Sequence, residues 1–129
     1  MCLLVALDPS GSSDHCVAEA CMVAGDGARV VAVVPLEIPL SLPLATPLPE
    51  AERQARETVA RARATALAYA VDVDARLVRT RSAGQAIVDE ARREHADSIV
   101  VSMPRGGRVG ATAEFVLRNA DCRVLVAAL

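Results

Sequence analysis

The chain has 129 residues, of which 53% are apolar and only 2% are aromatic, and its net charge is -2. This length fits one domain built around one core, and we expect residues 1–129 to form it. The weak charge and the scarcity of rings argue against a nucleic-acid partner, which needs basic patches or stacking aromatics. The core must consist of Val, Leu, Ile and Ala, which is typical of parallel sheets covered by helices.

Cysteine and histidine are too sparsely placed to form a metal site. The chain has 2 histidines and 4 cysteines, without metal-site spacing, so no metal is expected. Each cysteine lies in an apolar-periodic segment and is interpreted as a small buried hydrophobe. Free thiols favour a reducing compartment, so we expect a cytoplasmic protein. The cysteines are Cys2, Cys16, Cys21 and Cys122.

No segment of the sequence predicts a membrane helix. The longest apolar stretch, residues 30–48, contains Glu37 and a proline at every fourth position. Proline at that spacing is incompatible with a spanning helix. The N-terminus lacks a basic region before its apolar run, so it predicts no signal peptide either.

Short apolar runs predict five strands, at residues 3–7, 29–34, 71–80, 98–103 and 123–128. The second strand is expected to end at Pro35, which cannot donate a ladder hydrogen bond. Residues 71–80 alternate between apolar and charged side chains, which predicts a half-exposed strand at a sheet edge.

Helical periodicity separates these strands. A first helix is predicted after the capping residues 10–14 and ends at Gly25. Further helices are predicted over 50–70 and 84–95, and a fourth carries residues 113–120. His95 is interpreted as a charge partner for the negative end of the third helix.

Residues 35–49 repeat Pro-Leu every four positions, which excludes a helix and favours extended chain. One interpretation is a connector that lays its leucines over a sheet edge or a helix. The other is a docking surface for a partner protein.

Strands that alternate with helices imply parallel pairing and right-handed crossovers. We therefore predict a doubly wound five-stranded α/β sheet of order 3-2-1-4-5 with four helices. Ligands of such sheets bind at the carboxyl ends of the strands where the strand order reverses, here between strands one and four. The residues expected there are Asp8, Pro9, Ser10, Val34, Ser102, Met103 and the loop 104–111.

Catalytic constellations are not expected. Ser12, Ser13, Asp14 and His15 are consecutive at a helix start, where neighbouring side chains point apart and cannot form a triad. The sequence therefore favours a protein that is not an enzyme.

Three segments resemble the universal stress protein family. Residues 3–10 (LLVALDPS) are similar to its opening strand, which ends in Asp before a small-residue turn. Residues 96–102 (ADSIVVS) resemble its fourth-strand entry, and residues 110–126 resemble its closing helix and Cys-x-Val-Leu-Val strand. The resemblance covers the whole chain. It implies an adenine nucleotide alpha hydrolase-like fold and a regulatory role in stress response.

The ATP-binding branch of that family carries a Gly-x2-Gly-x9-Gly-Ser/Thr motif, from which this chain departs. Ser102 stands at the first glycine position, Arg105 at the second and Ala111 at the hydroxyl position. Only Gly110 matches, and residues 106–109 form a shorter spacer than the family's. The phosphate clamp is therefore reduced.

Other parts of a nucleotide site match by resemblance. Asp8 corresponds to the family's Asp at the first strand, and Val33 or Val34 to the valine that contacts adenine. The resemblance thus implies an adenine nucleotide, AMP or ATP, with weak phosphate contacts.

The shortened loop itself allows two interpretations. Gly106 and Gly107 can offer backbone amides, and Arg105 and Arg108 positive charge, to a small anion at the fourth helix. Alternatively, the glycines only make a tight turn and the arginines are solvated.

Residues 38–52 and 75–97 resemble cytoplasmic stress-protein-like domains fused to amino-acid permeases and cation antiporters. This resemblance implies, as an alternative function, a ligand-free interaction module that regulates a membrane transporter. The family resemblance also implies a homodimer, for which residues 123–128 form an apolar edge strand. A flavodoxin-like carrier shares the topology, but the chain is short and poor in aromatics for a flavin.

Overall fold

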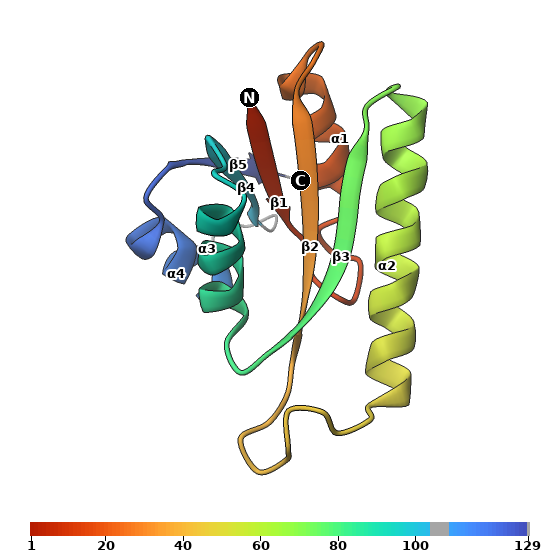
Figure 1. Ribbon diagram of the computed structural model, residues 1–129, viewed down its shortest axis with the longest axis vertical. Coiled ribbons are helices and arrows are strands. Elements are labelled where there is room, and N and C mark those ends of the chain that lie inside the picture. The colour runs from red at the N-terminus through yellow and green to blue at the C-terminus, as the bar shows by residue number, and fades with distance from the viewer. Residues whose placement is uncertain (104–108, 129) are drawn as a thin grey trace.

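The computed structural model describes residues 1–103 and 109–128, along which strands and helices alternate (Figure 1). The strands are β1 (Cys2–Ala6), β2 (Arg29–Glu37), β3 (Val73–Thr80), β4 (Ser98–Met103) and β5 (Arg123–Ala128). The helices are α1 (His15–Ala24), α2 (Pro49–Ala68), α3 (Ala83–Arg93) and α4 (Ala111–Asn119).

The strands form one parallel sheet in the order β3-β2-β1-β4-β5. Helices α1 and α2 cover one face of the sheet, and α3 and α4 cover the other (Figure 1). The predicted doubly wound fold and its strand order are therefore confirmed. The strand order reverses between β1 and β4, so the predicted ligand position lies at their carboxyl ends.

The core has one layer on each face of the sheet. Leu3, Leu4 and Val5 of the central strand β1 are at most 1% exposed. Leu3 and Val5 pack with α1 and α2, whereas Leu4 packs with α3 and α4, as strand alternation requires. Each fully buried side chain of this kind contributes about 1.5–3 kcal/mol, so small aliphatic residues suffice without aromatic rings.

The predicted end of the second strand is wrong, because β2 continues through Pro35 to Glu37. The carbonyl of Val33 accepts from the N–H of Leu7, at 2.9 Å, so the backbone N–H and C=O of Val33 point toward β1. Backbone groups alternate along a strand, so those of Pro35 point to the same side as those of Val33. The pairing of β2 with β1 ends at Val33, so no residue of β1 lies opposite Pro35. Proline is tolerated because no strand needs its missing N–H.

Strand β3 lies at the sheet edge, as predicted, but begins at Val73 rather than at residue 71. Ala70 has a φ of 54°, so the chain is still turning after α2 at that point. The charged face of β3 is partly covered, because Arg76 reaches Glu90 of α3 at 3.2 Å and Glu94, just after that helix, at 2.8 Å.

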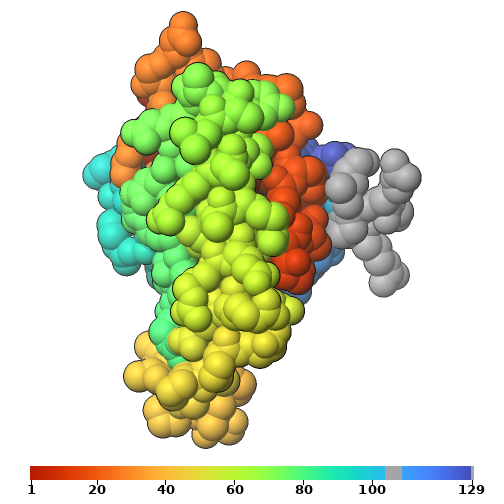
Figure 2. Space-filling view, turned by 90° about the vertical axis from the view of Figure 1, so that its right-hand side faces the viewer, coloured from red at the N-terminus to blue at the C-terminus, as the bar shows by residue number. Residues whose placement is uncertain are grey.

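The loop 38–48 is fixed by two arginines of β3 and its end. Arg79 donates to the carbonyl of Leu44, at 2.9 Å, and to that of Thr46. Arg81 donates to the carbonyls of Pro39 and Leu42, at 2.6 and 2.7 Å. The loop therefore has a defined shape, and it projects from one end of the molecule (Figure 2).

The loop does not lay all its leucines over the sheet or a helix. Leu40 is 88% exposed and Leu44 is 45% exposed, whereas Leu36, still within β2, is buried. The connector interpretation is wrong for Leu40 and Leu44, since the arginine contacts hold the backbone instead.

Helix α2 is the longest described helix, with 20 residues, and it carries ion pairs such as Arg53–Glu57 at 2.5 Å. Within the described ranges, no helix combines the length and the apolar character that crossing a membrane requires.

Helices α3 and α4 touch where Gly84 meets Phe115. A Cβ added to Gly84 would lie 2.6 Å from a ring carbon of Phe115 and 2.8 Å from its Cβ. Only glycine allows this approach, which holds the two helices that flank the carboxyl ends of β1 and β4.

We expect Gly84→Ala to lower the free energy of unfolding by about 1–3 kcal/mol, as overpacked sites do. The gain in helix propensity, at most about 1 kcal/mol, does not offset the clash. Urea unfolding measures the change. Gly110→Ala is the matched control: an added Cβ there meets nothing within 4 Å, so it should cost no more than the change of N-cap residue, about 0.5–1 kcal/mol. An unaltered midpoint for Gly84→Ala would contradict the close contact.

Candidate functional site

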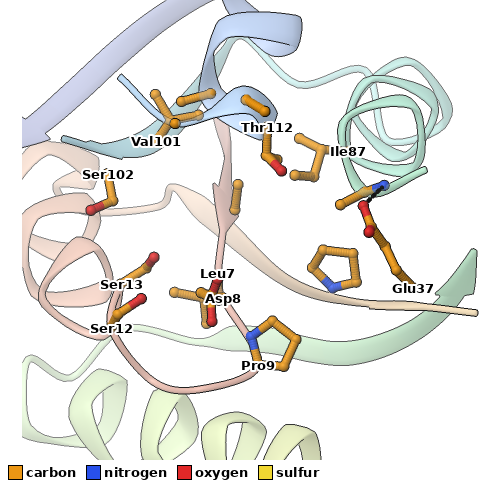
Figure 3. A pocket seen from close by; sticks show the side chains of 16 residues that line it. Leu7, Asp8, Pro9, Ser12, Ser13, Glu37, Ile87, Val101, Ser102 and Thr112 are labelled. Carbon is orange, nitrogen blue, oxygen red and sulfur yellow. Dashed lines mark hydrogen bonds between the residues drawn. The ribbon is translucent and has the colours of Figure 1, made fainter. Parts of the chain in front are cut away.

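A cavity of about 440 Å³ lies at the carboxyl ends of β1, β2 and β4 (Figure 3). This volume is typical of small-molecule sites. Most of its wall is apolar, with polar groups at a few positions. The lining residues are Ala6, Leu7, Asp8, Pro9, Ser12, Ser13, Pro35, Glu37, Ala83, Ile87, Val101, Ser102, Gly110, Ala111, Thr112 and Ala113.

The loop between β1 and α1 holds Asp8 in a fixed orientation. Oδ1 of Asp8 accepts from the N–H of Ser10 at 2.8 Å and from its hydroxyl at 2.5 Å. The chain then turns at Gly11, whose φ is 87° and whose N–H donates to the carbonyl of Asp8. Local hydrogen bonds of this kind stabilise turns. Asp8 therefore offers the cavity a preorganised carboxylate.

Helix α2 braces this loop from behind. The fully buried Thr58 donates its hydroxyl to the carbonyl of Pro9 at 2.9 Å. Arg61 donates to the carboxylate of Asp14 at 2.5 Å and to the hydroxyl of Thr58 at 2.9 Å. The position of Gly11 favours glycine because its φ is 87°, and a Cβ there would in addition press on the movable guanidinium of Arg61.

The N-terminus of α4 forms the opposite wall. Its N-cap is Gly110, which has no side chain to cap the helix, and Ala111 and Thr112 follow at the cavity. The first N–H groups of a helix lack intrahelical acceptors and carry partial positive charge. This end of the cavity therefore suits an anion such as a phosphate.

The β2 side of the cavity carries the opposite charge. Pro35 lines the wall, and Glu37 lies across the cavity from Ser102 (Figure 3). Oε1 of Glu37 accepts from the N–H of Ala83 at 2.9 Å, which holds the carboxylate at the start of α3. The cavity thus has an anion-binding wall at the N-terminus of α4 and a carboxylate on its β2 side.

The structure brings some of the predicted site residues together. Asp8, Pro9, Ser102, Gly110 and Ala111 all line the cavity. Ser10 does not line it but bonds to Asp8, and Met103 is half-buried at the end of β4.

Other predicted positions lie elsewhere or cannot be placed. Val33 and Val34 are fully buried in the two core layers, since β2 is longer than predicted and Pro35 and Glu37 reach the cavity instead. Arg105, Gly106, Gly107 and Arg108 lie outside the described residues.

Sequence reasoning missed the approach of His15 to Ser102. The Nε2 atom of His15 lies 3.2 Å from the carbonyl oxygen of Ala127 and 3.4 Å from the hydroxyl of Ser102. A carbonyl only accepts, so Nε2 carries the proton in this contact and cannot also take one from Ser102. The pair therefore lacks the arrangement of a nucleophile and its base.

The thiols offer no reactive group either. All four cysteines are free, and burial raises the pKa of Cys16 to about 11. Burial also raises the pKa of Cys2, Cys21 and Cys122, although Cys122 is only half-buried. The interpretation as buried hydrophobes holds for the first three cysteines. Among residues 1–103 and 109–128, no cluster of His, Cys, Asp or Glu has the makings of a metal site.

Fold and cavity together define a doubly wound α/β protein with a ligand-sized site at its topological switch point. The sequence pattern of the Universal stress protein family matches residues 2–128, so the chain belongs to this family. No curated protein sequence gave a significant match.

Solved structures share this fold. A universal stress protein from Archaeoglobus fulgidus in complex with dAMP has a TM-score of 0.81 and 22% identity, over 98% of this chain and 96% of that one. A family member from Burkholderia pseudomallei has 0.75 and 27%, over 98% and 94%. A family protein from Arabidopsis thaliana with AMP bound has 0.72 and 14%, over 99% and 91%.

We expect Thr58→Val to lower the free energy of unfolding by about 1–2 kcal/mol, because the carbonyl of the half-buried Pro9 would lose its donor with almost no change in side-chain volume. Chemical denaturation measures the effect. Thr65→Val is the matched control, a threonine of the same helix that is only half-buried, and should change stability by less than about 0.5 kcal/mol. Equal effects of the two substitutions would refute the brace.

Proposed function

We propose that this chain is a non-enzymatic regulatory domain that binds an adenine nucleotide, AMP or ATP, in the cavity between β1 and β4. The observation that carries this proposal is the combination of Asp8 and the N-terminus of α4 at the walls of one apolar cavity. Relatives of the same fold were solved with dAMP and with AMP, which supports an adenine nucleotide as the ligand.

The charges of the cavity suggest how the nucleotide lies. The phosphate belongs at α4, because the amides of Ala111 and Thr112 begin that helix. The sugar hydroxyls are donors and suit the carboxylate of Asp8. The base then occupies the apolar wall near Pro35 and Ile87. This orientation keeps the phosphate away from the Glu37 carboxylate.

A regulatory role without catalysis fits the chemistry of the site. In the described ranges, the imidazole near the Ser102 hydroxyl is that of His15. When its Nε2 donates to the carbonyl of Ala127, it cannot act as a base for Ser102. Hydrolysis of a nucleotide needs a positioned base to activate water, and no base of that kind is assigned to this site among the described residues. We expect the nucleotide to be bound and released unchanged, in the cytoplasm.

A second candidate function is a protein-interaction module, the cytoplasmic regulatory domain of an amino-acid permease or cation antiporter. The projecting loop 38–48 favours it, since Leu40 is 88% exposed on a backbone held by Arg79 and Arg81. A rigid loop loses little conformational entropy when it binds, so an exposed leucine there is a good anchor. Domains of this kind need no nucleotide, so nucleotide titration separates the two functions.

The nucleotide site predicts that Gly110→Leu will weaken AMP binding at least tenfold. Space around Gly110 is open, so a leucine side chain can enter the cavity mouth without a clash in the fold. Replacing the N-cap glycine of α4 costs only about 1 kcal/mol of stability. Calorimetric titration with AMP, ADP and ATP, with and without Mg²⁺, gives the affinities, and Gly110→Ala serves as the control.

Retained AMP affinity in Gly110→Leu would refute this placement of the ligand. If no nucleotide binds the unmodified protein even at high concentration, the interaction module becomes the better explanation.

We also propose that the protein forms a homodimer through β5, the outer strand beside β4. Among the described residues, β5 pairs only with β4 and no strand pairs with its other side, and Val126 on it is 41% exposed. We expect Val126→Glu to yield monomers, because two-fold symmetry would place two carboxylates in one interface. Leu67→Glu, on α2, should not change the oligomeric state. Sedimentation analysis decides, and a dimer that survives Val126→Glu would place the interface elsewhere.

A further inference from the structure

Glu37 belongs to the cavity wall but has no role in binding the phosphate or the sugar. It lies at the end of β2, across the cavity from Ser102, and one carboxylate oxygen accepts from the N–H of Ala83 (Figure 3). A carboxylate has two oxygens and about four lone-pair positions, so Glu37 keeps acceptor capacity for a ligand.

The backbone beside Glu37 also presents an acceptor. Val33 faces β1, since its carbonyl accepts from Leu7, and strand alternation turns Pro35 to the same side beyond the end of β1. Proline has no N–H, so its backbone offers this part of the cavity a carbonyl oxygen alone. Two acceptors, the Pro35 carbonyl and the Glu37 carboxylate, therefore lie together on the β2 side of the cavity, across from Ser102.

Charge decides which end of a nucleotide can approach them. A phosphate is repelled by Glu37 and attracted by the N-terminus of α4. The base is left to meet the two acceptors. Purines differ at C6, where adenine carries an amino group that donates two hydrogen bonds, and hypoxanthine carries a carbonyl oxygen that only accepts.

We propose that Glu37 makes the site selective for purine nucleotides with an amino group at C6 over those with a carbonyl group there. This inference rests on the proposed nucleotide-binding function. The amino group donates to Glu37, whereas a C6 carbonyl in the same position only accepts and would face two acceptors. An unmatched polar contact of this kind lowers affinity more than a missing apolar contact does.

The test compares AMP with IMP, which differ at C6 of the base and in the protonation of N1. Calorimetric titration gives the dissociation constants of both for the unmodified protein. We expect AMP to bind about tenfold more tightly than IMP. Enclosed sites discriminate by larger factors, but Glu37 is solvent-exposed and water can partly satisfy the mismatched groups. In Glu37→Gln the IMP/AMP ratio of dissociation constants should fall to about one, since the amide can donate to the C6 carbonyl.

Glu37→Gln retains an oxygen that accepts from Ala83, so a purely structural role of Glu37 would leave the ratio unchanged. The melting temperature should stay constant and shows whether the start of α3 is intact. Glu57→Gln, the same change on the exposed face of α2, is the control and should keep the ratio of the unmodified protein.

Equal affinities for AMP and IMP, or an unchanged ratio in Glu37→Gln, would overturn this inference and leave the nucleotide site standing. Tighter binding of GMP than of AMP would also overturn it, because the carboxylate would then contact N1–H and the C2 amino group. If neither AMP nor IMP binds, both this inference and the proposed function fail.

Discussion

The site depends on the unequal lengths of three neighbouring strands. Strand β1 lies between β2 and β4, yet its last paired residues, Ala6 with β2 and Val5 with β4, come before either neighbour ends. Strand β2 continues to Glu37 and β4 to Met103. A gap therefore opens beyond the end of β1, between two strands that still hold their positions. Leu7 and Asp8-Pro9 follow β1 at this point, and residues of α3 and α4 line the gap.

The gap persists because its borders are held by contacts outside the cavity. Thr58 and Arg61 of α2 bind the loop after β1 from the opposite face of the sheet. The close contact of Gly84 with Phe115 holds α3 against α4. Without such supports, apolar walls of this kind would tend to close, since burial of their surface is favourable. The same residues that stabilise the fold thus preserve an open site.

The fold can be predicted almost entirely from the sequence, because buried parallel strands are continuous apolar runs and alternate with amphipathic helices. The site is only partly predictable. Asp8, Ser102 and Gly110 follow from strand ends and helix starts, which local patterns mark. Local pattern also predicts that β2 ends at Pro35, because proline lacks the N–H that pairing requires. Whether a neighbouring strand needs that N–H depends on how far β1 extends. That length is a tertiary fact, so the place of Glu37 on the wall could not be predicted.

The approach of His15 to Ser102 is hidden from the sequence for a related reason. These residues are 87 positions apart, and each belongs to an element whose own pattern is fully explained by burial and capping. Only the placement of α1 over the ends of β4 and β5 brings the imidazole to the hydroxyl and to the carbonyl of Ala127. Sequence periodicity shows which face of an element is buried but not which side chains meet at its end.

The departure from the family's glycine motif changes the part of the site near α4, where a phosphate would bind, and leaves the walls formed by β1 and β2 unaffected. A helix N-terminus binds anions through backbone amides, so α4 keeps this property although Ala111 stands where the motif has a hydroxyl. Each such charge contact contributes only about 0.3–1 kcal/mol at an exposed position, so the remaining phosphate end favours a short phosphate chain. In the proposed nucleotide complex, most of the affinity must then come from the apolar wall and from hydrogen bonds to the sugar and base. Under the proposed nucleotide-binding function, Asp8 and Glu37 would therefore determine which ligand binds more than the phosphate end does.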